Sequence, residues 1–268
     1  MLFLKLKQED VVMIERMPAL FVGHGSPMNA IEKNEYSRNW SEIGKKIKRP
    51  EAILAVSAHW FTDGTRITDA ADPKMVYDMY GFPDELYRVK YQTKGNPDLA
   101  FRTKDLIKNS VKIDNTWGID HGVWSVLRHM YPEADIPLLQ LSIDYRSGAA
   151  VHYRLGQEIA SLRENGVMVL GSGNVVHNLS RISWGMNGGQ PWALEFDDYI
   201  KENIINGQHQ DVIDYENAGS SSKIAFPTPE HFYPLLYVLG ASNKEDKITV
   251  FNNSCTMGSI SMTSYLFE

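Results

Sequence analysis

The stretch MPALFVGHGSPM, residues 17–28, carries the first strong pattern in the chain. Its apolar run Ala19–Val22 is short and continuous, as is typical of a β-strand that is buried on both faces. The run leads directly into Gly23-His24-Gly25, where two residues without a Cβ let the backbone turn closely around a histidine. This stretch predicts a buried strand that presents His24 at the carboxyl edge of a sheet.

Apolar runs of the same kind recur along the chain, separated by stretches with helical spacing. Further strands are predicted at Ala52–Val56, Pro137–Ile143, Val167–Leu170, 248–251 and 259–267. Helices are predicted at 96–109, 151–164, 192–205 and 231–239. This alternation predicts an α/β fold, with a single domain built on a central mixed, largely parallel sheet flanked by helices.

Length, charge and cysteine content narrow the class of protein. The chain has 268 residues, which fits one domain over residues 17–268 after an N-terminal extension over residues 1–16. A net charge of −6 with scattered basic residues gives no electrostatic footprint for nucleic acid. No apolar run approaches the roughly 18 residues of a membrane span, and no signal-peptide pattern is present. The single cysteine, Cys255, fits a reducing compartment, so we expect a cytoplasmic location.

Histidines follow three of the predicted strands: His24, His59 and, further downstream of its strand, His177. In open α/β sheets, ligands bind beyond the carboxyl ends of the strands. Imidazole suits zinc, iron and copper, whereas calcium or magnesium would prefer oxygen ligands. The pattern predicts a transition-metal site on His24 and His59. The direction of His177 stays open, and His231, after Thr-Pro-Glu, could be either a ligand or part of a helix cap.

The remaining histidines and the serines carry weaker signals. His129, His152 and His209 lie in helical or polar stretches, and we expect them at the surface. Neither Ser26 nor Ser172 lies in the Gly-x-Ser-x-Gly pattern of a nucleophile elbow, and the glycines around Ser172 lack the spacing of a phosphate-binding loop.

Two further stretches each allow two interpretations. In Trp117–Gly122, Asp120 and His121 can reach into a site, and Asp120 can cap a helix that begins near Val123; both can hold at once. The aromatic stretch Met75–Phe82 either lines a pocket for a planar substrate or belongs to the core.

Taken together, five motifs resemble the DOPA-type extradiol dioxygenases, a branch of the class III ring-cleaving dioxygenases. The motifs are residues 17–28, 56–60, 117–122, 171–179 and 228–231, in that order. The resemblance covers residues 17–268, and five motifs in order are far more specific than any one of them. It implies a single α/β catalytic domain that inserts both atoms of O₂ into a catechol such as DOPA, beside the two hydroxyls. It also implies non-haem Fe(II) as the active metal, with Zn(II) as an alternative or as-purified metal.

The same resemblance implies roles for individual residues. His24, His59 and His231 match metal ligands, although the third ligand is a glutamate in protocatechuate-cleaving relatives and Glu230 is adjacent. His177 matches an acid/base histidine that can also serve as a fourth ligand when substrate is absent. Its unperturbed pKa near 6.5 suits a residue that accepts a catechol proton and later returns it. His121 matches a catalytic, substrate-contacting histidine. We expect further substrate contacts from two polar residues of the same loops, Ser26 and Asn174.

Three functions are compatible with these residues. The first is an extradiol dioxygenase whose partners are a small catechol and O₂, with no nucleic acid or membrane partner. The second is a zinc-dependent hydrolase, in which the imidazoles bind zinc and His177 or Glu230 activates water. The third is a non-catalytic binding relative, which is least favoured because every catalytic-type position is filled. We expect a monomer or a small homo-oligomer in each case.

Overall fold

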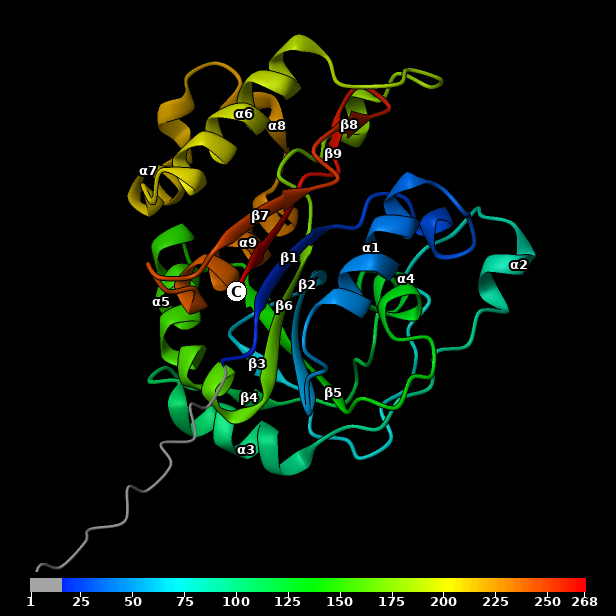
Figure 1. The fold of residues 1–268 in the computed structure, drawn as a ribbon, viewed down its shortest axis with the longest axis vertical. Helices are drawn as coiled ribbons and strands as arrows, with labels where there is room; N and C mark the ends of the chain where they lie inside the picture. Colours follow the sequence, from blue (N-terminus) through cyan, green and yellow to red (C-terminus); the bar gives the residue numbers. More distant parts are fainter. Residues whose placement is uncertain (1–15) are drawn as a thin grey trace, which may run out of the picture.

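A computed structural model describes residues 16–268, so the predicted N-terminal extension lies outside the described residues except for Arg16. The fold is a single α/β domain around an eight-stranded sheet of order β4-β3-β5-β2-β6-β1-β10-β7 (Figure 1). The strands are β1 (Ala19–Gly23), β2 (Ala52–Thr62), β3 (Arg66–Ile67), β4 (Lys112–Ile113), β5 (Leu138–Asp144), β6 (Val167–Gly173), β7 (Ile248–Phe251) and β10 (Ser264–Phe267). A separate two-stranded sheet pairs β8 (Cys255–Thr256) with β9 (Ile260–Ser261).

The four central strands β5, β2, β6 and β1 are mutually parallel, whereas β10 and β7 add antiparallel pairs at one side. At the other side β3 runs antiparallel to β5 and parallel to β4. Every residue of β1 and β6 is buried. This explains why the apolar runs are continuous, since both faces of these strands are covered. The predicted mixed, largely parallel sheet is confirmed.

Strand β2 is longer than its apolar run predicted, because it continues from Val56 to Thr62. Its pairing with β5 shifts register between Val56 and Phe61, so residues 57–60 form a bulge. Bulges re-aim side chains and are common next to active sites. His59 therefore lies within an irregular part of the strand rather than beyond its end.

Helices cover both faces of the sheet (Figure 1). One core cluster joins the sheet to α5 and α9, and the other joins it to α1 and α4. The helices are α1 (Glu35–Lys46), α2 (Asp84–Tyr87), α3 (Pro97–Leu106), α4 (His121–Met130), α5 (Ala149–Ile159), α6 (Pro191–Ile205), α7 (His209–Ile213), α8 (Ser222–Ala225) and α9 (Tyr233–Ala241). None of the helices in residues 16–268 is both long and apolar enough to cross a membrane.

Most of the predicted helices are present, but they begin or end at residues other than those predicted. Asn96 caps α3 by accepting a hydrogen bond from Leu99 N at 3.0 Å. Helix α5 begins at Ala149 and passes into a 3-10 turn, Ala160–Asn165, while α9 begins two residues after His231. The predicted strand 259–267 is interrupted between β9 and β10, because these two short strands pair in different sheets.

His152 corrects one expectation, because it is fully buried and not at the surface. Its Nε2 lies 3.2 Å from Ser147 O and its Nδ1 lies 3.1 Å from Tyr237 Oη. Burial lowers the pKa of His152 to about 4, so the ring is neutral between these two partners. His129 and His209 are half-buried, each bonded through one ring nitrogen.

Helices α5 and α9 cross at two glycines, which decide how closely they approach. A Cβ at Gly240 would lie 2.0 Å from Tyr153 O, and a Cβ at Gly156 would lie 2.3 Å from Tyr237 O. These distances are shorter than any van der Waals contact, so only glycine allows the two backbones to meet here. Helix α9 begins two residues after His231. The crossing therefore also holds the short turn that carries His231.

We expect Gly240→Ala to destabilise the fold, because overpacking in a dense core costs about 1–3 kcal/mol. Urea denaturation of the metal-free protein measures the free energy of unfolding. Gly148→Ala is the control, since a Cβ there has no neighbour within 4 Å and its φ of −82° suits alanine. Equal stability of the two variants would show that the crossing is not tightly packed.

Candidate metal centre

Three histidines from separate elements meet at the carboxyl edge of the central strands. His24 follows β1, His59 lies in the bulge of β2, and His231 ends the 3-10 turn Pro229–His231. One nitrogen of each lies within 4.8 Å of the others, an arrangement that could hold a metal ion. His24 Nε2 and His59 Nε2 are 3.1 Å apart. Two nitrogens bound to one metal at about 2.0–2.1 Å would lie about 2.9–3.4 Å apart at ordinary coordination angles.

A close approach of β6 to the turn before α9 brings His231 to this point. A Cβ at Gly173 would lie 2.0 Å from His231 O, so glycine is required there. The next residue, Asn174, donates its backbone N–H to the same His231 oxygen at 2.8 Å. Gly173 therefore serves packing against the His231 turn, and Gly171 serves packing against α9, where a Cβ would lie 2.5 Å from Pro234 O.

Burial keeps two of the three imidazoles neutral. Burial, reinforced by the neighbouring His59, His121 and His177, lowers the pKa of His24 well below its ordinary value. Burial and the same cluster of imidazoles lower the pKa of His231 in the same direction. Neutral imidazole offers the lone pair that a metal requires. His24 and His231 are thus in the protonation state that favours metal binding.

His59 differs because a carboxylate faces it. Asp78 Oδ2 lies 3.1 Å from His59 Nδ1, and Asp78 Oδ1 lies 3.0 Å from His121 Nδ1. Burial lowers the pKa of His59, but the contact with Asp78 and the charge of Asp120 outweigh it and raise that pKa. Burial raises the pKa of Asp78, but its two histidines outweigh this and hold it well below the usual range. Sequence reasoning missed Asp78, since it lies in a largely apolar and aromatic stretch with no metal-ligand spacing.

Each of the three histidines has an outer partner on its Nδ1. Ser172 Oγ donates to Gly122 O at 2.6 Å, so the serine oxygen can accept from His24 Nδ1, 3.0 Å away. This places the proton of His24 on Nδ1 and leaves Nε2 free. Such outer partners orient metal-binding histidines and fix their tautomers.

Glu230 takes the corresponding position beside His231. Its Oε1 lies 3.3 Å from His231 Nδ1, and its Oε2 is buried without a hydrogen-bond partner among the described residues. His231, not Glu230, lies among His24 and His59, whereas Glu230 groups with His177 and His231. The geometry thus favours His231 as the third donor and Glu230 as its outer partner.

His177 and His121 flank the three histidines. The ring of His177 stacks on that of His231 with centroids 3.4 Å apart and an interplanar angle of 5°. Burial, together with the charges of His59 and His121, lowers the pKa of His177 to about 3. The first residue of α4, His121, has its ring centroid 4.0 Å from that of His59, and burial lowers its pKa as well. The site therefore gathers five imidazoles, four of them neutral.

Two predicted substrate contacts have other partners in the structure. Ser26 Oγ accepts a hydrogen bond from Met28 N at 3.2 Å and caps the 3-10 turn Pro27–Ala30. Asn174 is fully buried and donates through Nδ2 to Ser261 O at 2.7 Å. Its Oδ1 is buried and has no partner among the described residues.

Asp120 stands at the N-cap position of α4, as one of the two interpretations has it, but its side chain makes no capping hydrogen bond. The carboxylate is fully buried and accepts instead from Ser57 Oγ at 2.7 Å and Gln140 Nε2 at 2.8 Å. A buried carboxylate needs several donors, and these side chains supply them from β2 and β5. Asp120 thereby ties the bulge of β2 to the start of α4.

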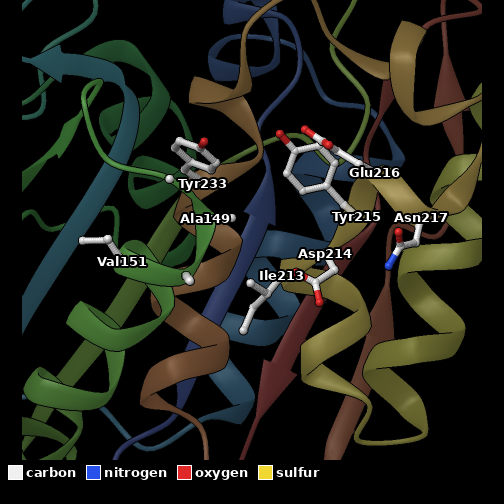
Figure 2. Close-up of a pocket in the computed structure, with 10 residues that line it drawn as sticks. Ala149, Val151, Ile213, Asp214, Tyr215, Glu216, Asn217 and Tyr233 are labelled. Atoms are coloured by element: carbon white, nitrogen blue, oxygen red, sulfur yellow. The ribbon is translucent and has the colours of Figure 1, made fainter.

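A pocket of about 440 Å³ lies between the first turn of α5 and residues 213–217 (Figure 2). Tyr233, two residues beyond His231, lines it together with Tyr215. None of the five clustered histidines lines this pocket. It is therefore separate from the candidate metal centre.

Comparisons with known proteins agree with this geometry. The LigB family model, described as the catalytic LigB subunit of aromatic ring-opening dioxygenase, matches residues 18–268. The chain is 47% identical over 264 residues to the 4,5-DOPA dioxygenase extradiol of Escherichia coli (strain K12), over 96% of this chain and 97% of that protein. It is 39% identical to the protein of the same name from Beta vulgaris, over 92% and 95% of the two chains.

A solved structure has the same fold. The crystal structure of an uncharacterized protein from Escherichia coli K12 superposes with a TM-score of 0.83 at 43% identity. The match covers 94% of this chain and 100% of that one.

We expect His24→Ala and His59→Ala each to lose bound metal, because each removes one of three converging nitrogens. Elemental analysis after metal loading and gel filtration measures the metal content per chain. His209→Ala is the control, since His209 is half-buried and bonded to Tyr153 Oη, away from the cluster. Full metal content in either test variant would refute this site.

We expect Ser172→Ala to weaken metal binding by roughly 10–100-fold, because His24 loses the partner that fixes its tautomer. Competition with a chromogenic chelator measures the dissociation constant for Zn²⁺. Ser161→Ala, at an exposed position, should match the wild type. A wild-type dissociation constant in Ser172→Ala would mean that His24 needs no such partner.

Proposed function

The chain belongs to the LigB family of aromatic ring-opening dioxygenases, and on that premise we propose that it cleaves a catechol such as DOPA in the extradiol manner, with non-haem Fe(II) as its active metal. It is accordingly an oxidoreductase of the extradiol type. The observation that carries the proposal is the convergence of His24, His59 and His231 at one point, with His121 and His177 beside them.

The donor set fits a catalytic metal. Three imidazole nitrogens leave coordination positions for substrate and O₂, as a catalytic site requires. When bound, the metal supplies Lewis acidity that lowers the pKa of the catechol hydroxyls, and a place where O₂ can react. Zn(II) is an alternative or as-purified occupant, because divalent affinities generally favour zinc over iron.

His177 is proposed as the acid/base residue and His121 as a second catalytic histidine that contacts the substrate. Burial keeps His177 neutral, with its pKa lowered to about 3, so it can accept a proton. An ionised catechol beside it would favour the imidazolium and oppose the effect of burial. His177 can then return the proton to the reacting substrate in a later step.

The substrate contacts proposed for Ser26 and Asn174 have unequal support. Ser26 Oγ already accepts the backbone bond that caps the 3-10 turn. Asn174 Oδ1 is buried without a hydrogen-bond partner among the described residues, so it is the atom that we propose for a contact with a substrate hydroxyl.

We also propose that residues 17–268 form the catalytic domain, acting on a small catechol and O₂ as a monomer or small homo-oligomer. The proposed location is the cytoplasm. The single cysteine, Cys255, is buried as a free thiol, which suits a reducing compartment.

Anaerobic protein loaded with Fe(II), mixed with DOPA or simpler catechols and then exposed to oxygen, should form a yellow ring-opened product. O₂ uptake should be stoichiometric with product, because both oxygen atoms enter it. An oxygen electrode and absorbance spectroscopy measure the two quantities. Absence of uptake across the catechols, together with ester or amide hydrolysis by the zinc-loaded protein, would favour a hydrolase instead.

We expect His177→Ala to lower turnover by about 10²–10⁴-fold while retaining most of the metal, because it removes a proton carrier and none of the three donors. Steady-state oxygen uptake and elemental analysis measure activity and metal content. His209→Ala serves again as the control. Loss of all metal in His177→Ala would make His177 a principal ligand.

A further inference from the structure

Asp78 contacts two of the clustered histidines at once. Its carboxylate oxygens lie 3.1 Å from His59 Nδ1 and 3.0 Å from His121 Nδ1, and its side chain is only 11% exposed. Neither contact counts as a hydrogen bond, because His121 Nδ1 and Asp78 Oδ2 have no hydrogen-bond partner among the described residues. The attraction is therefore chiefly that of a carboxylate for two nearby N–H dipoles. No other carboxylate among the described residues lies within 4.0 Å of two of these histidines.

The position of Asp78 is fixed by backbone bonds on its N-terminal side. Val76 N donates to Ile119 O at 2.8 Å, and Ile119 N donates to Lys74 O at 2.9 Å. Trp124 Nε1 of α4 donates to Val76 O at 3.0 Å. The segment leading to Asp78 is thus attached to the start of α4.

Asp78 also occupies the amino end of α4. Its Oδ1 accepts a hydrogen bond from His121 N at 3.0 Å, at the first residue of that helix. A negative charge at this end is stabilised by the helix dipole. Asp78 supplies from another segment the acceptor that the Asp120 side chain does not provide.

Proton positions follow from the chemistry of the carboxylate. An ionised carboxylate only accepts, so its charge favours a hydrogen on each facing Nδ1. In a neutral ring, the form that a bound metal requires of His59, this leaves Nε2 as the free lone pair. For His59 that atom is the one that lies 3.1 Å from His24 Nε2. For His121 the same logic makes Nε2 an acceptor on the side of the ring turned away from Asp78.

We propose that Asp78 is a positioning residue that holds His59 and His121 in the Nδ1–H tautomer, so that His59 Nε2 faces the metal and His121 Nε2 accepts from the substrate. The inference rests on the proposed function for the metal and substrate. One carboxylate then couples the geometry of a metal ligand to that of a substrate-facing histidine. Movement of either ring alters the contact available to the other.

The first test is the tautomer itself, measured on the zinc-loaded wild-type protein by nitrogen-15 NMR of the histidine side chains. We expect Nδ1–H signals for both His59 and His121. An Nε2–H tautomer at His121 would overturn the proposal whether or not the protein turns over a catechol.

The second test compares Asp78→Asn with Asp78→Glu. Asparagine offers one acceptor and one donor, so it cannot serve both Nδ1–H groups, whereas glutamate keeps two acceptors. We expect Asp78→Asn to weaken Zn²⁺ binding by roughly 10–100-fold and to lower kcat more than it changes KM. Asp78→Glu should recover part of both losses.

Asp114→Asn is the matched control, because Asp114 is 10% exposed and pairs with Arg66 away from the histidines. It should leave the Zn²⁺ dissociation constant and the two tautomers unchanged. Wild-type Zn²⁺ affinity and tautomers in Asp78→Asn would overturn the proposal. Both readouts, Zn²⁺ affinity and histidine tautomer, are measured without a catechol. A failure of this proposal can therefore be told apart from a failure of the proposed catechol cleavage.

Discussion

The site depends on the burial of five imidazoles packed at one edge of the sheet, three of them buried and two, His59 and His177, partly exposed. Charged imidazoles cannot coexist at such distances in a buried site, because each would lose its hydration and repel the others. Burial therefore keeps His24, His121, His177 and His231 neutral, and only at His59 do Asp78 and Asp120 outweigh its effect on the pKa. Neutral rings have a lone pair to offer, and that property makes the cluster suitable for a metal and for proton transfer.

A neutral imidazole has two tautomers, so burial alone does not determine which nitrogen faces the centre. The outer partners do so in this protein. Ser172 accepts from His24, Asp78 faces His59 and Glu230 lies against His231. These partners come from β6, from the segment before α2 and from the turn before α9. The site is consequently tied to several parts of the fold, and a shift in any of them would turn one of the rings.

Close backbone contacts support this arrangement. Gly122 leaves room for His59, since a Cβ there would lie 2.9 Å from the His59 ring. Gly173 allows the His231 turn to rest on β6, and the α5–α9 crossing holds the helix that follows. The bulge of β2 turns His59 toward the centre, and Asp120 binds that bulge through Ser57. Packing and chemistry therefore constrain the same short segments.

The sequence by itself determined the fold class, the four buried parallel strands and the candidate histidines His24 and His59, because continuous apolar runs and strand-end glycines are local patterns. Motif order added the family, together with His231, His177 and His121. Tertiary structure alone decided that His231 rather than Glu230 joins the first two, that Asp78 faces two histidines, and that His152 is buried. The physical reason is that these contacts join residues far apart in the chain, and their distances are set by how helices and turns pack on the sheet.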